Sequence, residues 1–195
     1  MWPWGHLAVG YLLYSGGRRL LGRSAPDDRC ALALALGALV PDLVDKPLSW
    51  GLGLFPSGYA VGHSALIAFP AGLALLAAGY RRGRGALALA GAFVVGYWSH
   101  LAGDVLSGLP YGDGLAFSAV LWPLVEREPS PEQYGLLGRG LHYLREFGAA
   151  VGTSDRPVVL LLAAFGPAAL ALALWLLDGA PGPRALARAG RRLAR

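Results

Sequence analysis

Residues 85–106 read GALALAGAFVVGYWSHLAGDVL, an apolar run that ends with a histidine and an aspartate four residues apart. Most of this run suits a membrane-spanning helix. Residues four apart lie on the same face of a helix, with Cβ atoms about 5–6 Å apart. His100 and Asp104 could therefore bind one metal ion together, or they could only hydrogen-bond each other.

The composition of the chain is typical of a membrane protein. Hydrophobic residues make up 55% of the 195 residues and charged residues 15%, whereas about a quarter of the residues of a soluble domain are charged. The mean hydropathy is +0.47. The length suits a single integral-membrane domain over residues 1–195, all-α in class. Cys30 is the only cysteine of the sequence, so a disulfide framework and a cysteine-based zinc site are excluded.

The apolar runs predict about five transmembrane helices and therefore a polytopic helical bundle. They cover residues 4–21, 30–44, 60–79, 85–106 and 157–177. The second run is short because it ends near Pro41. The first run is expected to be a retained helix and not a signal peptide, because no basic residue precedes it.

The arginines predict the orientation of this bundle. Three segments of the chain contain 12 of the 17 basic residues, all of them arginines. A bundle of five spans would place these three segments on the same side of the membrane. These segments follow the first, third and fifth runs, the last being the basic tail 179–195. The positive-inside rule makes that side cytoplasmic and predicts a multi-pass protein of the cytoplasmic membrane, with its N-terminus outside and its C-terminus inside. The bilayer is then the expected partner, no nucleic acid is expected, and no oligomeric state is predicted.

The long polar segment 107–156 is expected on the outer side. Ser130, Pro131 and Gln133 have the types and spacing of a helix start, and the predicted helix runs to about Phe147. Its mixture of leucine and charged residues predicts an amphipathic helix on the bilayer surface. Within this segment His142 and Glu146 repeat the four-residue spacing. That spacing fits either a second pair of metal ligands or a charged face paired with nearby arginines.

Ionisable residues near the outer ends of the runs predict a metal site. On this topology they fall at similar depth, and they are His6, Asp42, Asp45, His63, His100 and Asp104. Such groups are costly in a membrane and tend to mark functional sites or paired networks. Three imidazoles with three carboxylates are a nitrogen and oxygen donor set for a divalent metal, with zinc as the expected ion. Taken singly, each residue also suits an interfacial anchor, a helix cap or a turn.

Four motifs carry a family resemblance. They are His6, GALVPDLVD at 37–45, Gly62-His63-Ser64, and GYWSHLAGD at 96–104. Together they resemble the membrane-bound metal-dependent hydrolase family of YdjM type, and the likeness covers roughly residues 1–125. The resemblance implies a metal site more directly than it implies a particular reaction.

The order of these residues is also similar, more distantly, to the ligand order of the zinc-dependent phospholipase C and single-strand nuclease superfamily. That likeness implies a two-metal centre bridged by Asp104, and a third ion at His142 and Glu146. The remaining ligands it implies are His6, Asp42 or Asp45, His63 and His100. The superfamily also uses a free N-terminal amine and a further histidine after the His-x-x-x-Asp motif. Here Met1 and Trp2 stand at the start, and only Asp113 stands near the place of that histidine.

The expected function is hydrolysis of a phosphoester at the outer face of the membrane. Two metal ions can activate a water molecule and neutralise phosphoryl charge, while a free carboxylate, Asp42 or Asp45, accepts the proton. A phospholipid or a lipid-linked phosphate is the expected substrate because of the location. Two alternatives stay open: a metal-ion or proton transporter, and a non-catalytic membrane scaffold with a structural metal site.

Overall fold

The computed structural model describes residues 1–129 and 134–183, and this part of the chain contains helices and no strand. The α-helices are α1 (Pro3–Leu20), α2 (Asp28–Lys46), α3 (Ala65–Arg82), α4 (Arg84–Leu106), α5 (Gly135–Thr153) and α6 (Pro157–Leu177). Short helical turns follow α2 and α4, namely η1 (Pro47–Gly51), η2 (Leu109–Tyr111) and η3 (Phe117–Ala119). The predicted all-α class is confirmed for these residues.

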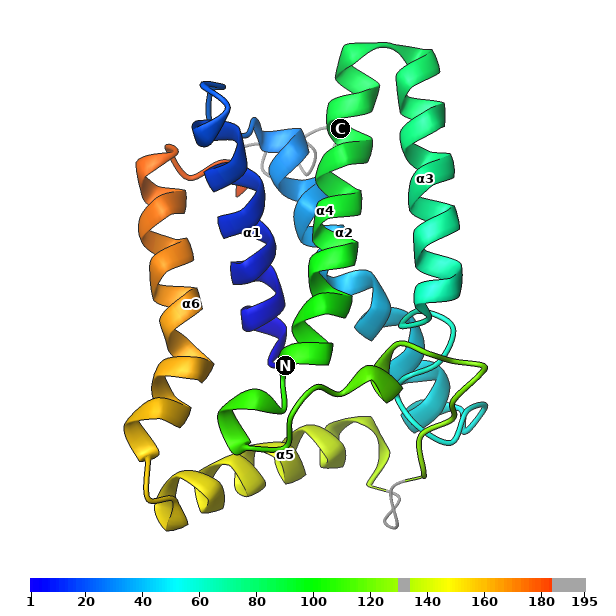
Figure 1. Ribbon diagram of the computed structural model, residues 1–195, viewed down its shortest axis with the longest axis vertical. Helices are drawn as coiled ribbons and strands as arrows, with labels where there is room; N and C mark the ends of the chain where they lie inside the picture. The colour runs from blue at the N-terminus through cyan, green and yellow to red at the C-terminus, as the bar shows by residue number, and fades with distance from the viewer. Residues whose placement is uncertain (130–133, 184–195) are drawn as a thin grey trace, which may run out of the picture.

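Five of the helices run along the long axis of the molecule, and α5 crosses one end of them (Figure 1). Helix α4 is central and packs against α1, α2 and α3, while α6 packs against α1. The chain begins at the end that α5 crosses, and the α1–α2 and α3–α4 turns lie at the opposite end (Figure 1). The first two of the predicted arginine segments therefore share one end of the bundle.

Two glycines let α2 and α4 cross with their backbones in contact. A Cβ atom on Gly37 would lie 2.1 Å from the carbonyl oxygen of Phe93, and one on Gly96 would lie 2.3 Å from that of Leu34. Small residues allow this close approach between helices, and any larger side chain would force them apart. The crossing sets the C-terminal half of α2 beside the C-terminal half of α4, where the ionisable residues are.

The prediction of five transmembrane spans is not supported. Within residues 1–129 and 134–183, two helical segments are long and apolar enough to cross a membrane: Arg84–Tyr111, with a mean hydropathy of 1.3, and Pro157–Leu177, with 2.3. Helix α2 contains charged residues at both ends, and α3 ends in Arg81-Arg82, which lowers the hydropathy of each. The third run also begins in a turn, because α3 starts only at Ala65 and leaves His63 in the preceding loop.

The amphipathic helix predicted in segment 107–156 is present as α5, shifted toward the C-terminus. It covers Gly135–Thr153, whereas the prediction placed it from about residue 131 to 147. The predicted helix start at 130–133 and the arginines from 184 onward lie outside the described residues. Helix α5 touches the bundle through its aromatic residues: Phe147 meets Trp2, and Tyr143 meets Trp50. Its leucines 137, 141 and 144 remain exposed.

Candidate metal centre

Asp45, at the end of α2, holds the loop that carries His63. Its carboxylate accepts hydrogen bonds from the backbone N–H groups of Ala60, Gly62 and His63, at 2.8, 2.8 and 2.9 Å. It also accepts one from the ring Nδ1 of His63 at 2.8 Å. Asp45 therefore positions His63, because both of its oxygens are already occupied by donors.

The ring of His100 is oriented in the same way by the backbone of α2. Its Nδ1 lies 2.7 Å from the carbonyl oxygen of Ala38. A carbonyl only accepts hydrogen bonds, so Nδ1 carries the proton, and in a neutral ring Nε2 then carries the lone pair. A backbone or carboxylate partner on one ring nitrogen is the usual way in which a protein prepares the other for a metal.

The Nε2 atoms of His63 and His100 face each other at a distance of 3.1 Å. Because the Nδ1 proton of His63 is donated to Asp45 and that of His100 to Ala38, two lone pairs point at each other when both rings are neutral. Two facing lone pairs repel each other, and either a proton on one Nε2 atom or a metal ion bound by both would remove that repulsion. The orientation of the two rings therefore fits a metal ion between them.

Two carboxylates flank the facing nitrogens. Asp104 Oδ2 lies 3.3 Å from Nε2 of His100 and 3.4 Å from Nε2 of His63. Asp42 Oδ1 lies 3.4 Å from Nε2 of His63 and 3.8 Å from that of His100. Donor atoms bound about 2.0–2.1 Å from a tetrahedral zinc ion lie roughly 3.3 Å from one another. The spacing of these four side chains therefore suits one ion of that size.

His6 extends the centre on the other oxygen of Asp104. Its Nε2 lies 3.3 Å from Asp104 Oδ1, and its ring stacks on that of His100 with centroids 3.6 Å apart. The residue is 1% exposed, and neither ring nitrogen forms a hydrogen bond with any described residue. The amino nitrogen of Met1 lies 2.7 Å from the same Asp104 oxygen. A buried imidazole without a hydrogen-bond partner is costly, so His6 also fits a ligand.

The structure thus brings together five of the predicted ligands from four separate segments. They form two overlapping groups that could hold a metal ion, His6 with His100 and Asp104, and Asp42 with His63 and His100. Within each group the ligand atoms lie within 4.8 Å of one another. Asp104 presents one oxygen to each side, which is the arrangement expected of the predicted bridging carboxylate.

His142 and Glu146 are not brought to this centre. His142 lies on α5, where its ring stacks on Tyr134 at 4.7 Å between centroids and lies near Tyr143. Glu146 is exposed, and neither residue belongs to the two groups found among the described residues. The four-residue spacing on one helix face is present here as predicted, but α5 runs across the end of the bundle instead of into it (Figure 1).

Three further residues border the centre that the sequence did not single out. Lys46 Nζ lies 2.5 Å from Asp42 Oδ2, one helical turn along α2. Tyr59 packs its ring against His63 with centroids 4.8 Å apart, and Arg127 covers Tyr59 at 4.4 Å. Burial raises the pKa of Tyr59. Lys46 could have been found from its spacing to Asp42, whereas nothing in the sequence connects Tyr59 or Arg127 with the site.

The chain matches the model of a known family. The family described as YdjM inner membrane protein matches residues 1–179. No curated protein and no solved structure matches the chain significantly. The likeness to the phospholipase C and nuclease superfamily is not shown by any of these comparisons and stays a prediction. The matched region contains α1 to α6 and all the residues of the candidate centre, so the chain belongs to the YdjM inner membrane protein family.

Proposed function

We propose that this protein is a membrane-embedded, metal-dependent hydrolase that cleaves a phosphoester bond of a lipid or of a lipid-linked phosphate. The observation that carries the proposal is the pair of facing Nε2 atoms of His63 and His100, 3.1 Å apart and flanked by two buried carboxylates. The Nδ1 atoms of His63 and His100 donate away from the centre, to Asp45 and Ala38, and so direct the Nε2 atom of each ring toward it. A partner on one ring nitrogen is how proteins usually orient the other toward a metal.

The proposed ligands are His6, Asp42, His63, His100 and Asp104, and the proposed ion is zinc, with a second ion on the His6 side of Asp104. A divalent metal in such a site lowers the pKa of a bound water molecule toward 7 and neutralises charge on a phosphoryl group. Asp42 is proposed either as a metal ligand or as the base, because a carboxylate that accepts the proton must keep an oxygen free of the metal. Asp45 is proposed to act only through His63, because its oxygens already accept four hydrogen bonds.

The surroundings of the centre support a phosphorylated lipid as substrate. Lys46 provides a cation beside Asp42, and its side chain is 22% exposed, whereas the five proposed ligands are 0–9% exposed. A phosphate group entering from that side would meet Lys46 first. Helix α5 covers the same end of the bundle and exposes leucines, as a helix lying in the membrane interface does (Figure 1).

The proposed topology places the metal centre at the outer face. The arginines at positions 18, 19, 23, 29, 81, 82 and 84 belong to the opposite end of the bundle, near the α1–α2 and α3–α4 turns (Figure 1). By the positive-inside rule this end is cytoplasmic. We propose a multi-pass arrangement with α4 and α6 as spans and with α1, α2 and α3 packed beside them in the bilayer, the N-terminus outside and the C-terminus inside.

The test combines metal content with lipid hydrolysis on the full-length protein in detergent. We expect stoichiometric zinc, manganese or iron in the unmodified protein, its loss in His100→Ala and Asp104→Ala, and its retention in His142→Ala, a matched histidine outside the centre. The unmodified protein and His142→Ala should also release phosphate or a phosphorylated headgroup from membrane phospholipids, whereas His100→Ala and Asp104→Ala should not. Absence of bound metal from the unmodified protein would refute the centre. Bound metal with metal flux into liposomes, but without hydrolysis, would identify a transporter instead.

A further inference from the structure

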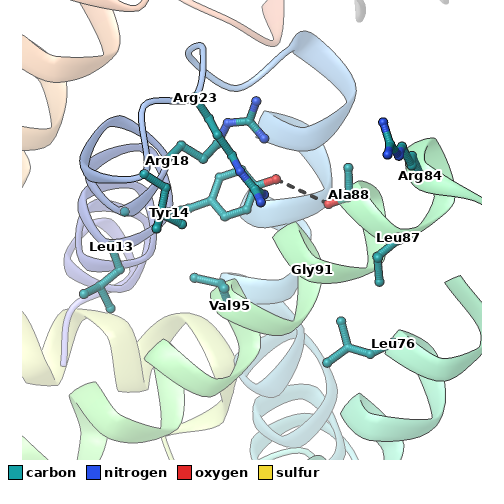
Figure 2. A pocket seen from close by; sticks show the side chains of 12 residues that line it. Leu13, Tyr14, Arg18, Arg23, Leu76, Arg84, Leu87, Ala88, Gly91 and Val95 are labelled. Atoms are coloured by element: carbon teal, nitrogen blue, oxygen red, sulfur yellow. Dashed lines mark hydrogen bonds between the residues drawn. The ribbon is translucent and has the colours of Figure 1, made fainter. Parts of the chain in front are cut away.

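A large pocket opens at the arginine end of the bundle, whereas the metal centre lies at the other end (Figure 1). It has a volume of about 820 Å³ and lies between α1, α3 and α4 (Figure 2). It is lined at one end by arginines and elsewhere by leucine, valine and glycine. Its volume is in the range of small-molecule sites, roughly 300–1,000 Å³. The reaction proposed above uses none of its residues.

Three arginines line this pocket, and Asp27 acts electrostatically on one of them, Arg18. Arg18 and Arg23 lie beside Tyr14 on one side, and Arg84 lies on the other (Figure 2). No carboxylate of the described residues lies within ion-pair distance of any of the three. Arg18 donates to the carbonyl of Ser24 at 2.8 Å and lies over the Tyr14 ring, which fixes its position. Three cations around one opening favour the binding of an anionic group. A phosphate fits best, because a planar guanidinium group can donate two parallel hydrogen bonds to it.

The remainder of the pocket is apolar and has the length of half a bilayer. Leu13, Leu76 and Val95 line it below the arginines (Figure 2). Arg84 and Val95 both belong to α4, so at 1.5 Å per residue the wall between them is about 16 Å long. One leaflet of a hydrocarbon core about 30 Å thick has the same depth. The pocket therefore combines a charged opening with an apolar groove of one leaflet's depth.

We infer that this pocket binds an anionic phospholipid, with its phosphate at Arg18, Arg23 and Arg84 and an acyl chain along the groove toward Val95. The positive charge of the three arginines favours an anionic headgroup. The length of the apolar groove favours a lipid with an acyl chain over a small soluble anion. The site is independent of the chemistry at the metal centre. The proposed topology only adds that the lipid comes from the cytoplasmic leaflet, whose anionic lipids attract arginines.

Native mass spectrometry of the full-length protein in detergent tests this inference. We expect phosphatidylglycerol to stay bound while phosphatidylcholine with the same acyl chains does not. Arg23→Gln and Arg84→Gln should each weaken retention about fivefold, the equivalent of about 1 kcal/mol. Arg82→Gln removes an exposed arginine at the same end that does not line the pocket, and it should leave retention unchanged.

A second pair of variants tests the groove without altering charge. A Cβ atom on Gly91 or on Gly85 would meet nothing within 4 Å, and both residues belong to α4, but only Gly91 lines the pocket. Gly91→Leu should therefore fill the groove and reduce lipid retention, whereas Gly85→Leu should not. Equal loss in Arg82→Gln and Arg84→Gln, or unchanged retention in Gly91→Leu, would overturn the inference. Inorganic phosphate retained as well as the lipid would identify a free anion as the ligand and would also overturn it.

Discussion

The buried carboxylates at the two ends of the bundle have different kinds of partners. At the arginine end Asp178 accepts hydrogen bonds from Tyr11 at 2.7 Å and from Ser15 at 2.5 Å, and it pairs with Arg19. Every partner there is a donor, so the charge is compensated by the protein itself. At the other end Asp42 and Asp104 face imidazole nitrogens whose ring protons are donated elsewhere. The first network joins α6 to α1. In the second, Asp42 pairs with Lys46 and Asp104 with the Met1 amine, and the facing imidazole Nε2 atoms are directed to where a metal ion could bind.

The strongest test of this difference compares Asp45→Asn with Asp178→Asn. Loss of a carboxylate that orients a metal-binding histidine lowers metal affinity about 10- to 100-fold. Asp45→Asn should show this loss in a competitive chelator titration, because His63 then loses the charged acceptor of its Nδ1 proton. Asp178→Asn should leave metal affinity unchanged. An equal loss of metal affinity in both variants would show that Asp45 has no specific role in metal binding.

A second test concerns the α2–α4 crossing that builds the centre. Gly37→Ala would place a Cβ atom 2.1 Å from the backbone oxygen of Phe93, so the helices must separate. We expect a loss of about 2 kcal/mol in the free energy of unfolding, measured by denaturant titration in detergent, together with weaker metal binding. Gly91→Ala on α4 is the control, because its Cβ atom would meet nothing within 4 Å. It should be neutral or slightly stabilising, and an equal effect of both variants would rule out the crossing as the cause.

The smallest expected effect is the pH dependence of the Asp178 network. Burial raises the pKa of Asp178, but hydrogen bonds from Ser15, Tyr11 and Arg19 outweigh it, so the pKa in the folded protein is lower than in the unfolded chain. Its contribution is therefore present above the ordinary carboxylate pKa of about 3.9 and is lost as the pH falls through the lower folded value. We expect a difference of about 1 kcal/mol between the unmodified protein and Asp178→Asn at pH 7.

Thermal unfolding of both proteins between pH 7 and pH 3 measures this difference. It should be constant near neutrality and should shrink only in the acidic part of the range. A difference that grew as the pH fell would contradict the assigned direction of the pKa shift. The metal centre is excluded from the comparison by carrying out both series in the presence of a chelator.

The residues of the candidate centre could be predicted because they depend on local patterns. Apolar runs show where helices lie, since hydropathy is a property of each segment alone. Ionisable residues at the ends of such runs stand out because burying them is costly. His6, Asp42, His63, His100 and Asp104 were found in this way, and the structure brings them together. The number of spans was predicted less well, because hydropathy alone does not separate a spanning helix from one that packs beside it.

The roles within the centre depend on contacts between distant segments, which no local pattern contains. Asp42 and Asp45 look equivalent in the sequence, yet one faces the imidazoles and the other accepts hydrogen bonds behind His63. His142 and Glu146 have the same spacing as His100 and Asp104, and they differ only in the direction of the helix that carries them. Residue types and helical period thus identify the candidate ligands from the sequence. The packing of α2 on α4, possible because Gly37 and Gly96 lack side chains, determines which of them meet.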